Sequence, residues 1–353
     1  WTGVEASDVS VLGGRDNDTI TATFSGVSAS VRTAGASASR GANIRGNKGN
    51  DELFVTLSGT ADLVVVGGNS GSDTIAVSAE QNVNRLTVAG GRDNDSISAT
   101  IANGISSVAT TLQGDLGNDS IVLNLASGGF AQTTNVLGGS GTDVLTVNNT
   151  AGAAFLFGDN NTIHAGTGAD TINVNLGSDI NTQGTAGFVG NLGAAGTVSG
   201  GTAGLGGTLN LNISATQSGG GVRFIGTEAG DDFNITQKTG EAGILNGAVF
   251  SAESGADTIT LDINTGGAFS AINIAGGSGA DVITAEIDGQ TLFNAATAGQ
   301  ISVQGGAGND TLVVNLGSET AGATLSAGFF AGNDGADVLT VNLAGTTTAG
   351  VAA

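Results

Sequence analysis

Residues 305–312 read GGAGNDTL, and variants of this octapeptide recur along nearly the whole chain, so the fold is predicted from this repeat. Other copies are GGSGTDVL at residues 138–145, GGRDNDTI at 13–20 and GNKGNDEL at 46–53. The aspartate that closes the glycine-rich part serves as the anchor of each copy. Twelve anchors are present: Asp18, Asp51, Asp73, Asp95, Asp119, Asp143, Asp170, Asp231, Asp257, Asp281, Asp310 and Asp337.

A strand pattern flanks every anchor. After Asp310, apolar residues stand two, four and six positions on, at Leu312, Val314 and Leu316, and mostly polar residues separate them. Another apolar residue, here Val303, stands seven positions before the anchor. Alternation with a period of two is typical of a β-strand with one buried face. Each unit is therefore predicted to be a strand, a glycine-rich turn, a second strand and a variable return.

Successive anchors lie 22 to 33 residues apart, except for a gap of 61 between Asp170 and Asp231. Within this gap, the strand pattern recurs after Gly207, which stands where the aspartate is expected. We interpret the gap as a degenerate coil preceded by an irregular Gly/Ala/Thr-rich insertion at residues 179–206. Two strands alone bury too little surface, whereas stacked units bury a common core. We therefore expect an all-β chain, one continuous parallel β-solenoid over residues 1–353 with about 13 coils of 22–29 residues.

The composition limits what the chain can bind. It has 31 acidic and nine basic residues, a formal net charge of -22 and no cysteine. Nucleic acid and anionic membranes are improbable partners, because phosphate binding needs clusters of Lys and Arg. No apolar run approaches the ~20 residues of a membrane span, so we expect no membrane insertion. The absence of cysteine excludes disulfides, and a single histidine, His164, leaves zinc without its usual ligands.

Stacked coils would place the anchor carboxylates in a column. Carboxylates ~5 Å apart repel by roughly 1 kcal/mol in water, and by more near a surface of low dielectric constant. A hard divalent cation between the loops removes this repulsion, and calcium accepts six to eight oxygen ligands, including backbone carbonyls. Magnesium demands a stricter octahedron. The alternative, that glycine and aspartate only form turns, accounts poorly for aspartate at twelve of thirteen positions. We therefore expect several Ca2+ ions.

The loops resemble the Gly-Gly-x-Gly-x-Asp-x-apolar-x repeat of the RTX (repeats-in-toxin, hemolysin-type) calcium-binding proteins, best at residues 138–145, 276–283 and 305–312. The resemblance implies a right-handed parallel β-roll, calcium between stacked loops, and secretion from a bacterium to an extracellular or cell-surface location. It also implies that the twelve anchors are side-chain ligands and that carbonyls of the preceding glycines complete the shell.

This chain departs from the RTX pattern in two respects. It has one loop per coil, so we expect ions along one edge at most. One of the repeat glycines is replaced by Asp16, Asp93 and Ala229, and the two aspartates are additional candidate ligands.

We expect a structural protein and not an enzyme. Polysaccharide-cleaving enzymes need paired carboxylates, usually with basic or aromatic residues that hold the sugar, and here Trp1 is the only tryptophan and tyrosine is absent. His164 is interpreted as a turn or surface residue. An ice-binding face is disfavoured, because no strict Thr-x-Thr column persists.

The strand pattern continues to Leu343 without a capping helix. Open strand edges favour head-to-tail pairing of copies. We therefore expect a homopolymer in a bacterial surface layer, sheath or extracellular filament, with a cell-surface glycan as a further candidate partner. The alternatives are the stalk of an adhesin, or the secretion and folding module of a larger exported enzyme or toxin.

Overall fold

The computed structural model divides into two compact units, Trp1–Thr167 (unit 1) and Gly168–Ala353 (unit 2). Each unit consists of strands joined by turns, and no helix occurs among the described residues, so none of them forms a helix able to span a membrane. The structure describes residues 9–25, 41–101, 106–125, 130–131, 134–149, 162–176, 197–199, 207–213, 223–237, 247–269, 272–292, 301–317, 328–344 and 351–352.

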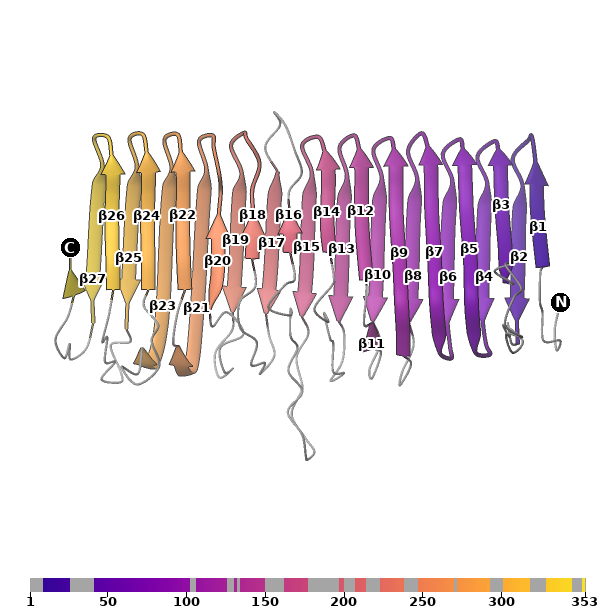
Figure 1. The fold of residues 1–353 in the computed structure, drawn as a ribbon, viewed down its shortest axis with the longest axis horizontal. Coiled ribbons are helices and arrows are strands. Elements are labelled where there is room, and N and C mark those ends of the chain that lie inside the picture. The colour runs from indigo at the N-terminus through magenta and orange to yellow at the C-terminus, as the bar shows by residue number, and fades with distance from the viewer. Residues whose placement is uncertain are drawn as a thin grey trace, which may run out of the picture. The chain divides into compact units, whose positions relative to one another are not determined.

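Unit 1 contains two parallel sheets that the chain visits in turn (Figure 1). The first sheet has the order β1 (Val9–Gly14), β3 (Ala42–Lys48), β5 (Ala61–Ser70), β7 (Val83–Arg92), β9 (Ser106–Leu116), β12 (Thr134–Ser140) and β14 (Thr162–Thr167), and β11 (Phe130–Ala131) also pairs with β9. The second has the order β2 (Thr19–Phe24), β4 (Glu52–Leu57), β6 (Thr74–Ala79), β8 (Ser96–Ile101), β10 (Ser120–Leu125) and β13 (Val144–Asn149).

Unit 2 repeats this arrangement. One sheet has the order β16 (Thr197–Ser199), β18 (Arg223–Ile225), β20 (Ala248–Ser251), β22 (Ile272–Ser278), β24 (Ile301–Ala307), β26 (Gly328–Asp334) and β28 (Val351–Ala352). The other has the order β15 (Thr171–Leu176), β17 (Thr208–Ile213), β19 (Asp232–Gln237), β21 (Thr258–Phe269), β23 (Val282–Leu292), β25 (Thr311–Leu316) and β27 (Val338–Leu343).

The register of the strands aligns every coil on its anchor. The residues that directly follow three anchors of unit 1, Ser96, Ser120 and Val144, are successive Cα partners in the second sheet. Equivalent positions therefore form straight columns, and a glycine-rich turn precedes each strand of this sheet. The expected all-β parallel solenoid is confirmed.

The alternation read from the sequence places the core between the two sheets. In β10, Ile121, Leu123 and Leu125 are fully buried, as the pattern two, four and six residues after the anchor predicts. The position seven residues before the anchor is also buried, and in unit 2 it brings Phe224 and Phe250 into a stacked pair with ring centroids 4.7 Å apart.

The predicted insertion at residues 179–206 lies mostly outside the described residues. Its residues Thr197–Ser199 form β16, which pairs with β18, so this part belongs to a coil. The strand predicted after Gly207 is present as β17. One continuous solenoid over residues 1–353 stays a prediction.

Candidate metal centre

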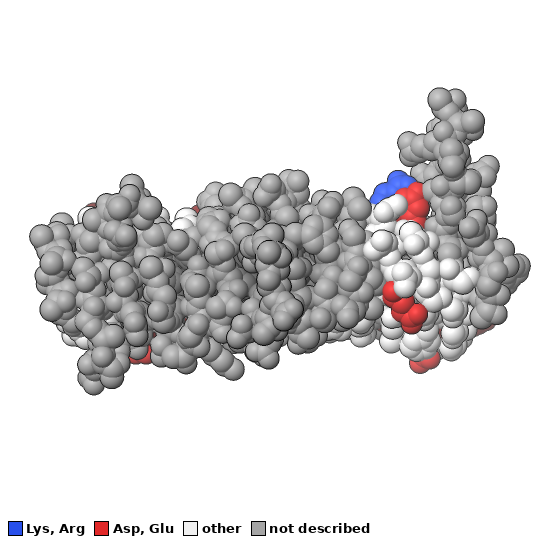
Figure 2. Space-filling model, turned by 90° about the horizontal axis from the view of Figure 1, so that it is seen from below, with Lys and Arg blue, Asp and Glu red and all other residues white. Residues whose placement is uncertain are grey.

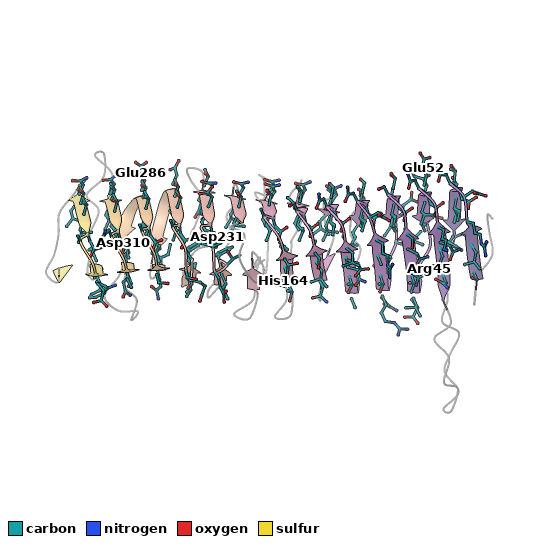
Figure 3. All side chains as sticks on the ribbon, turned by 90° about the horizontal axis from the view of Figure 1, so that it is seen from above. Arg45, Glu52, His164, Asp231, Glu286 and Asp310 are labelled. Atoms are coloured by element: carbon teal, nitrogen blue, oxygen red, sulfur yellow. The ribbon has the colours of Figure 1, made fainter. Side chains whose placement is uncertain are left out.

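The turn between the two strands of most coils buries the anchor carboxylate. Figure 3 shows Asp231 and Asp310 between the two layers of strands, whereas Glu52 and Glu286 point away from them. Carboxylates are almost never fully buried unless another group compensates their charge. At most 3% of the surface is exposed in each of Asp51, Asp73, Asp95, Asp119, Asp143, Asp170, Asp231, Asp257, Asp281 and Asp310.

One oxygen of each carboxylate joins neighbouring coils. In unit 1, the backbone N–H of Asp51 donates to Oδ1 of Asp73 at 2.7 Å, and the N–H of Asp73 donates to Oδ1 of Asp95 at 2.8 Å. The same bond links Asp18 to Asp51, Asp95 to Asp119 and Asp119 to Asp143. In unit 2 it links Asp231 to Asp257, Asp257 to Asp281, Asp281 to Asp310 and Asp310 to Asp337. We call this series the anchor ladder.

The second carboxylate oxygen, Oδ2, is buried without a hydrogen-bond partner in seven anchors. A buried polar atom without a partner is unfavourable, and an unpaired ionised one is more so. A cation at each loop would remove this deficit. The seven anchors are Asp51, Asp73, Asp95, Asp119, Asp257, Asp281 and Asp310.

A second kind of oxygen lies beside these carboxylates. A Cβ added to Gly276, five residues before its anchor, would overlap Oδ2 of Asp281 and also the carbonyl oxygen of Gly305 in the next coil. In unit 1, Gly114 faces Oδ2 of Asp119 and the carbonyl oxygen of Gly138 in the same way. The glycine thus leaves room where a carboxylate and a carbonyl oxygen converge.

Two left-handed residues give the loop its shape. In the loop of Asp281, Gly277 and Gly279 have φ of 110° and 139°. Side chains rarely adopt such angles, whereas glycine does so freely. Glycine occupies both points in this loop and turns the chain tightly around the carboxylate, whereas in other loops a residue such as Asn47 or Asp115 takes a positive φ at the first of them.

This donor set fits calcium. Within the described residues, no three His, Cys, Asp or Glu side chains surround one point. An ion bound in these loops would therefore need other oxygen ligands besides the carboxylates, such as backbone carbonyls, which calcium accepts readily. The loops offer hard oxygen atoms and no thiolate, and His164 is on β14, outside the turns. The residues that would hold calcium are the anchors with an unpartnered Oδ2, together with carbonyls of the adjacent coil.

Burial shifts the acidity of these carboxylates. Desolvation is the largest cause and raises the pKa of Asp73 to about 6, of Asp257 to about 7 and of Asp95 to about 8. The backbone N–H of the preceding anchor lowers each pKa, and neighbouring aspartates raise it further. A cation that binds the ionised form must therefore displace protons near neutral pH.

The remaining candidates of the sequence analysis lie in different surroundings. Asp18 and Asp337 are half-buried, and Asp16 and Asp93 are exposed. Oδ2 of Asp93 accepts a hydrogen bond of 3.1 Å from the N–H of Gly71 in the neighbouring loop. A ligand role for Asp16 and Asp93 stays a prediction, as does the ligand role of each individual anchor.

Sequence reasoning missed a second ladder one residue before the anchors. Oδ1 of Asn17 accepts from the N–H of Asn50 at 2.8 Å, and Oδ1 of Asn118 accepts from the N–H of Thr142 at 2.8 Å. Asn309 bonds to Ala336 in the same way. The recurrence of asparagine before aspartate was the available signal.

Acidic side chains also outnumber basic ones on the part of the surface that the structure describes. Where described residues are visible in Figure 2, carboxylates occur at several places and basic side chains at one. The few basic groups include Arg85, which lies 3.4 Å from Asp62. Basic side chains are therefore too few to neutralise the anchors.

Comparison with known families agrees with this geometry. A family model described as the RTX calcium-binding nonapeptide repeat matches residues 157–180 and 302–318, in four copies. These ranges contain the loops of Asp170 and Asp310. No curated protein and no solved structure matches the chain.

Proposed function

The chain carries RTX repeats, which bind calcium and are typical of secreted bacterial proteins, and on this premise we propose that it is an extracellular structural protein whose coils are held together by calcium at the anchor aspartates. The buried, unpartnered Oδ2 atoms carry the proposal. Each is a carboxyl oxygen that the fold has removed from water without providing a hydrogen-bond donor. A bound cation explains why burial at this position is tolerated seven times.

The test is a calcium count on the purified chain, combined with thermal unfolding in calcium and in EDTA. We expect several ions per chain and a large fall in Tm on chelation, since ligands that bind only the folded state add their binding free energies to stability. Asp119→Asn should reduce the ion count, whereas Asp62→Asn, on the surface, should not. A Tm that is the same with and without EDTA would show that calcium does not stabilise the fold.

The specific role that we propose is self-assembly into a surface layer, sheath or filament. β27 is the last described strand of its sheet, and 58% of Val338, 39% of Leu339 and 38% of Leu343 are exposed. Such an edge favours pairing with another strand. The first coil of a second copy would provide parallel strands and matching columns of side chains, in a head-to-tail contact that repeats.

Electron microscopy and sedimentation with calcium test this role. Ordered polymers that dissolve in EDTA would support it. Isolated molecules at all concentrations would instead favour the two alternatives, the stalk of an adhesin or the secretion module of a larger exported protein. Leu339→Lys combined with Leu343→Lys should abolish assembly and retain calcium binding.

A further inference from the structure

The loop at residues 226–231 differs from the loops of Asp257, Asp281 and Asp310 in unit 2. Where the loop of Asp281 has Gly277 and Gly279 in the left-handed region, this loop has Thr227 and Ala229. Neither Thr227 nor Ala229 is among the described residues with positive φ. The backbone therefore follows another path to its anchor, Asp231.

Thr227 uses this path to satisfy the anchor carboxylate. Its backbone N–H donates to Oδ2 of Asp231 at 2.6 Å, and its hydroxyl Oγ1 lies 3.1 Å from the same oxygen. The N–H of Ala229 donates to Oγ1 of Thr227 at 3.1 Å and fixes the hydroxyl in place. Only 4% of Thr227 is exposed. Asp231 thus lacks the unpartnered Oδ2 that marks the seven anchors described above.

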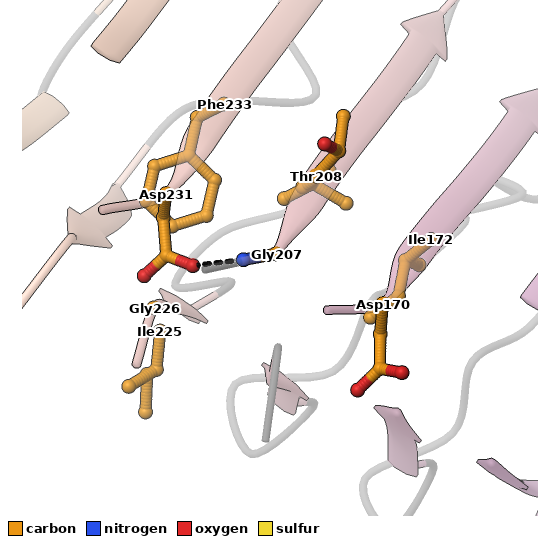
Figure 4. A pocket seen from close by; sticks show the side chains of 9 residues that line it. Asp170, Ile172, Gly207, Thr208, Ile225, Gly226, Asp231 and Phe233 are labelled. Carbon is orange, nitrogen blue, oxygen red and sulfur yellow. Dashed lines mark hydrogen bonds between the residues drawn. The ribbon is translucent and has the colours of Figure 1, made fainter. Parts of the chain in front are cut away.

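The preceding coil has no carboxylate at all. Gly207 occupies the anchor position, and its N–H donates to Oδ1 of Asp231 at 2.6 Å (Figure 4). A pocket lined in part by Asp170, Gly207, Gly226 and Asp231 lies beside the missing side chain. Neither of these two loops therefore offers a cation an unpartnered anchor carboxylate oxygen, and Glu228, the other acid in the loop of Asp231, is exposed.

We infer that Thr227 replaces a calcium ion at the loop of Asp231, so that the loops of Gly207 and Asp231 form a metal-free break in the ion column of unit 2; this inference rests on the proposed function. An ion at this loop would have to displace the two donors of Thr227 from Oδ2. The hydrogen bonds hold this loop closed with or without calcium. Binding resumes at Asp257, whose Oδ2 is unpartnered.

Calcium counts on matched variants test the inference. The whole chain is stripped with chelator, dialysed against calcium and analysed for bound metal. Asp231→Asn should bind as many ions as the unmodified chain, whereas Asp257→Asn should lose at least one. An equal loss in both variants overturns the break. No loss in Asp257→Asn would instead contradict calcium at the anchors, so the two failures are distinguishable.

A second variant tests the metal-free break by a gain of calcium binding. It also provides the test if Asp231→Asn does not fold. Thr227→Gly combined with Ala229→Gly restores the two glycines of the repeat and releases Oδ2 of Asp231. This variant should bind at least one more ion than the unmodified chain. An unchanged count would show that Thr227 does not keep the ion out.

Discussion

The glycine that stands two residues before most of the anchors is needed for two separate reasons. Gly279 has φ of 139°, and a Cβ at this point would overlap the carbonyl oxygen of Gly255 in the preceding coil. The positive φ is a requirement of the loop's own backbone, and the overlap with Gly255 is a requirement of the close spacing between coils. The turn of the loop and the close stacking of neighbouring coils therefore both require a residue without a side chain at this position.

Gly279→Ala should therefore destabilise the protein by about 1–3 kcal/mol, the usual cost of forcing extra volume into a packed site. Urea unfolding in saturating calcium measures the effect. Ser278→Ala, at the exposed neighbouring position, is the matched control and should change stability by less than about 0.5 kcal/mol. Equal midpoints for the two variants would contradict this account of the turn.

The raised pKa of Asp95 predicts how the chelated protein responds to pH. Its pKa is about 8 in the folded chain against an ordinary value of 3.8, because burial disfavours the charged form. Its contribution to stability is complete below pH 3.8 and is lost as pH rises through about 8. In EDTA, Tm should fall between pH 5 and about 8, and Asp95→Asn should reduce that slope. A Tm that rises over this range would refute the prediction.

At the scale of the strand, one position breaks the apolar pattern of the core. Gln237 stands six residues after Asp231, where Ile213 and Ile263 are its Cα partners in the adjacent strands. It is 1% exposed, and its Oε1 and Nε2 have no hydrogen-bond partner. β19 therefore buries an amide in a column of isoleucine.

Gln237→Leu should stabilise the protein by about 1–3 kcal/mol, the usual cost of an unsatisfied buried polar group. Urea unfolding of both proteins in saturating calcium measures the difference. Gln237→Glu should have the opposite effect, because a charge is buried at still greater cost. A leucine variant that is no more stable would mean that the amide finds a partner in solution.

The strands and anchors could be predicted because they repeat. A period of two and a constant offset from aspartate specify which of Ile121, Val122 and Leu123 point inward. The bonding of the carboxylates could not be predicted, since an N–H from the preceding coil takes one oxygen only once the register is known. Thr227 was missed for a related reason: in sequence it is one substitution among several, and only its contacts reveal its effect on Asp231.

At the scale of the whole molecule, charge and metal act together. The formal net charge of -22 opposes compaction, and many of the carboxylates responsible are in columns. Each bound divalent ion offsets this repulsion at the place where it is greatest. Stability should therefore depend on the identity of the cation, and not only on ionic strength.

Calcium should raise Tm well above the value in the same concentration of magnesium, because the loops offer carbonyl oxygens in a flexible arrangement and magnesium requires a strict octahedron. Differential scanning calorimetry at matched ionic strength measures this. Sodium chloride at equal ionic strength is the control for charge screening, and it should produce only a small part of the rise in Tm that calcium produces. Equal stabilisation by all three salts would mean that no specific site exists.

The anchor ladder has a direction, and this has a consequence for how such a chain changes in evolution. Each coil with an anchor aspartate between two others presents one acceptor, Oδ1, to the coil before it and one donor, its anchor N–H, to the coil after it. A duplicated coil brings both halves of this connection, and a deletion of a whole coil removes both. The array can therefore lengthen or shorten by complete coils and leave every remaining junction intact, whereas a cut within a loop would break two.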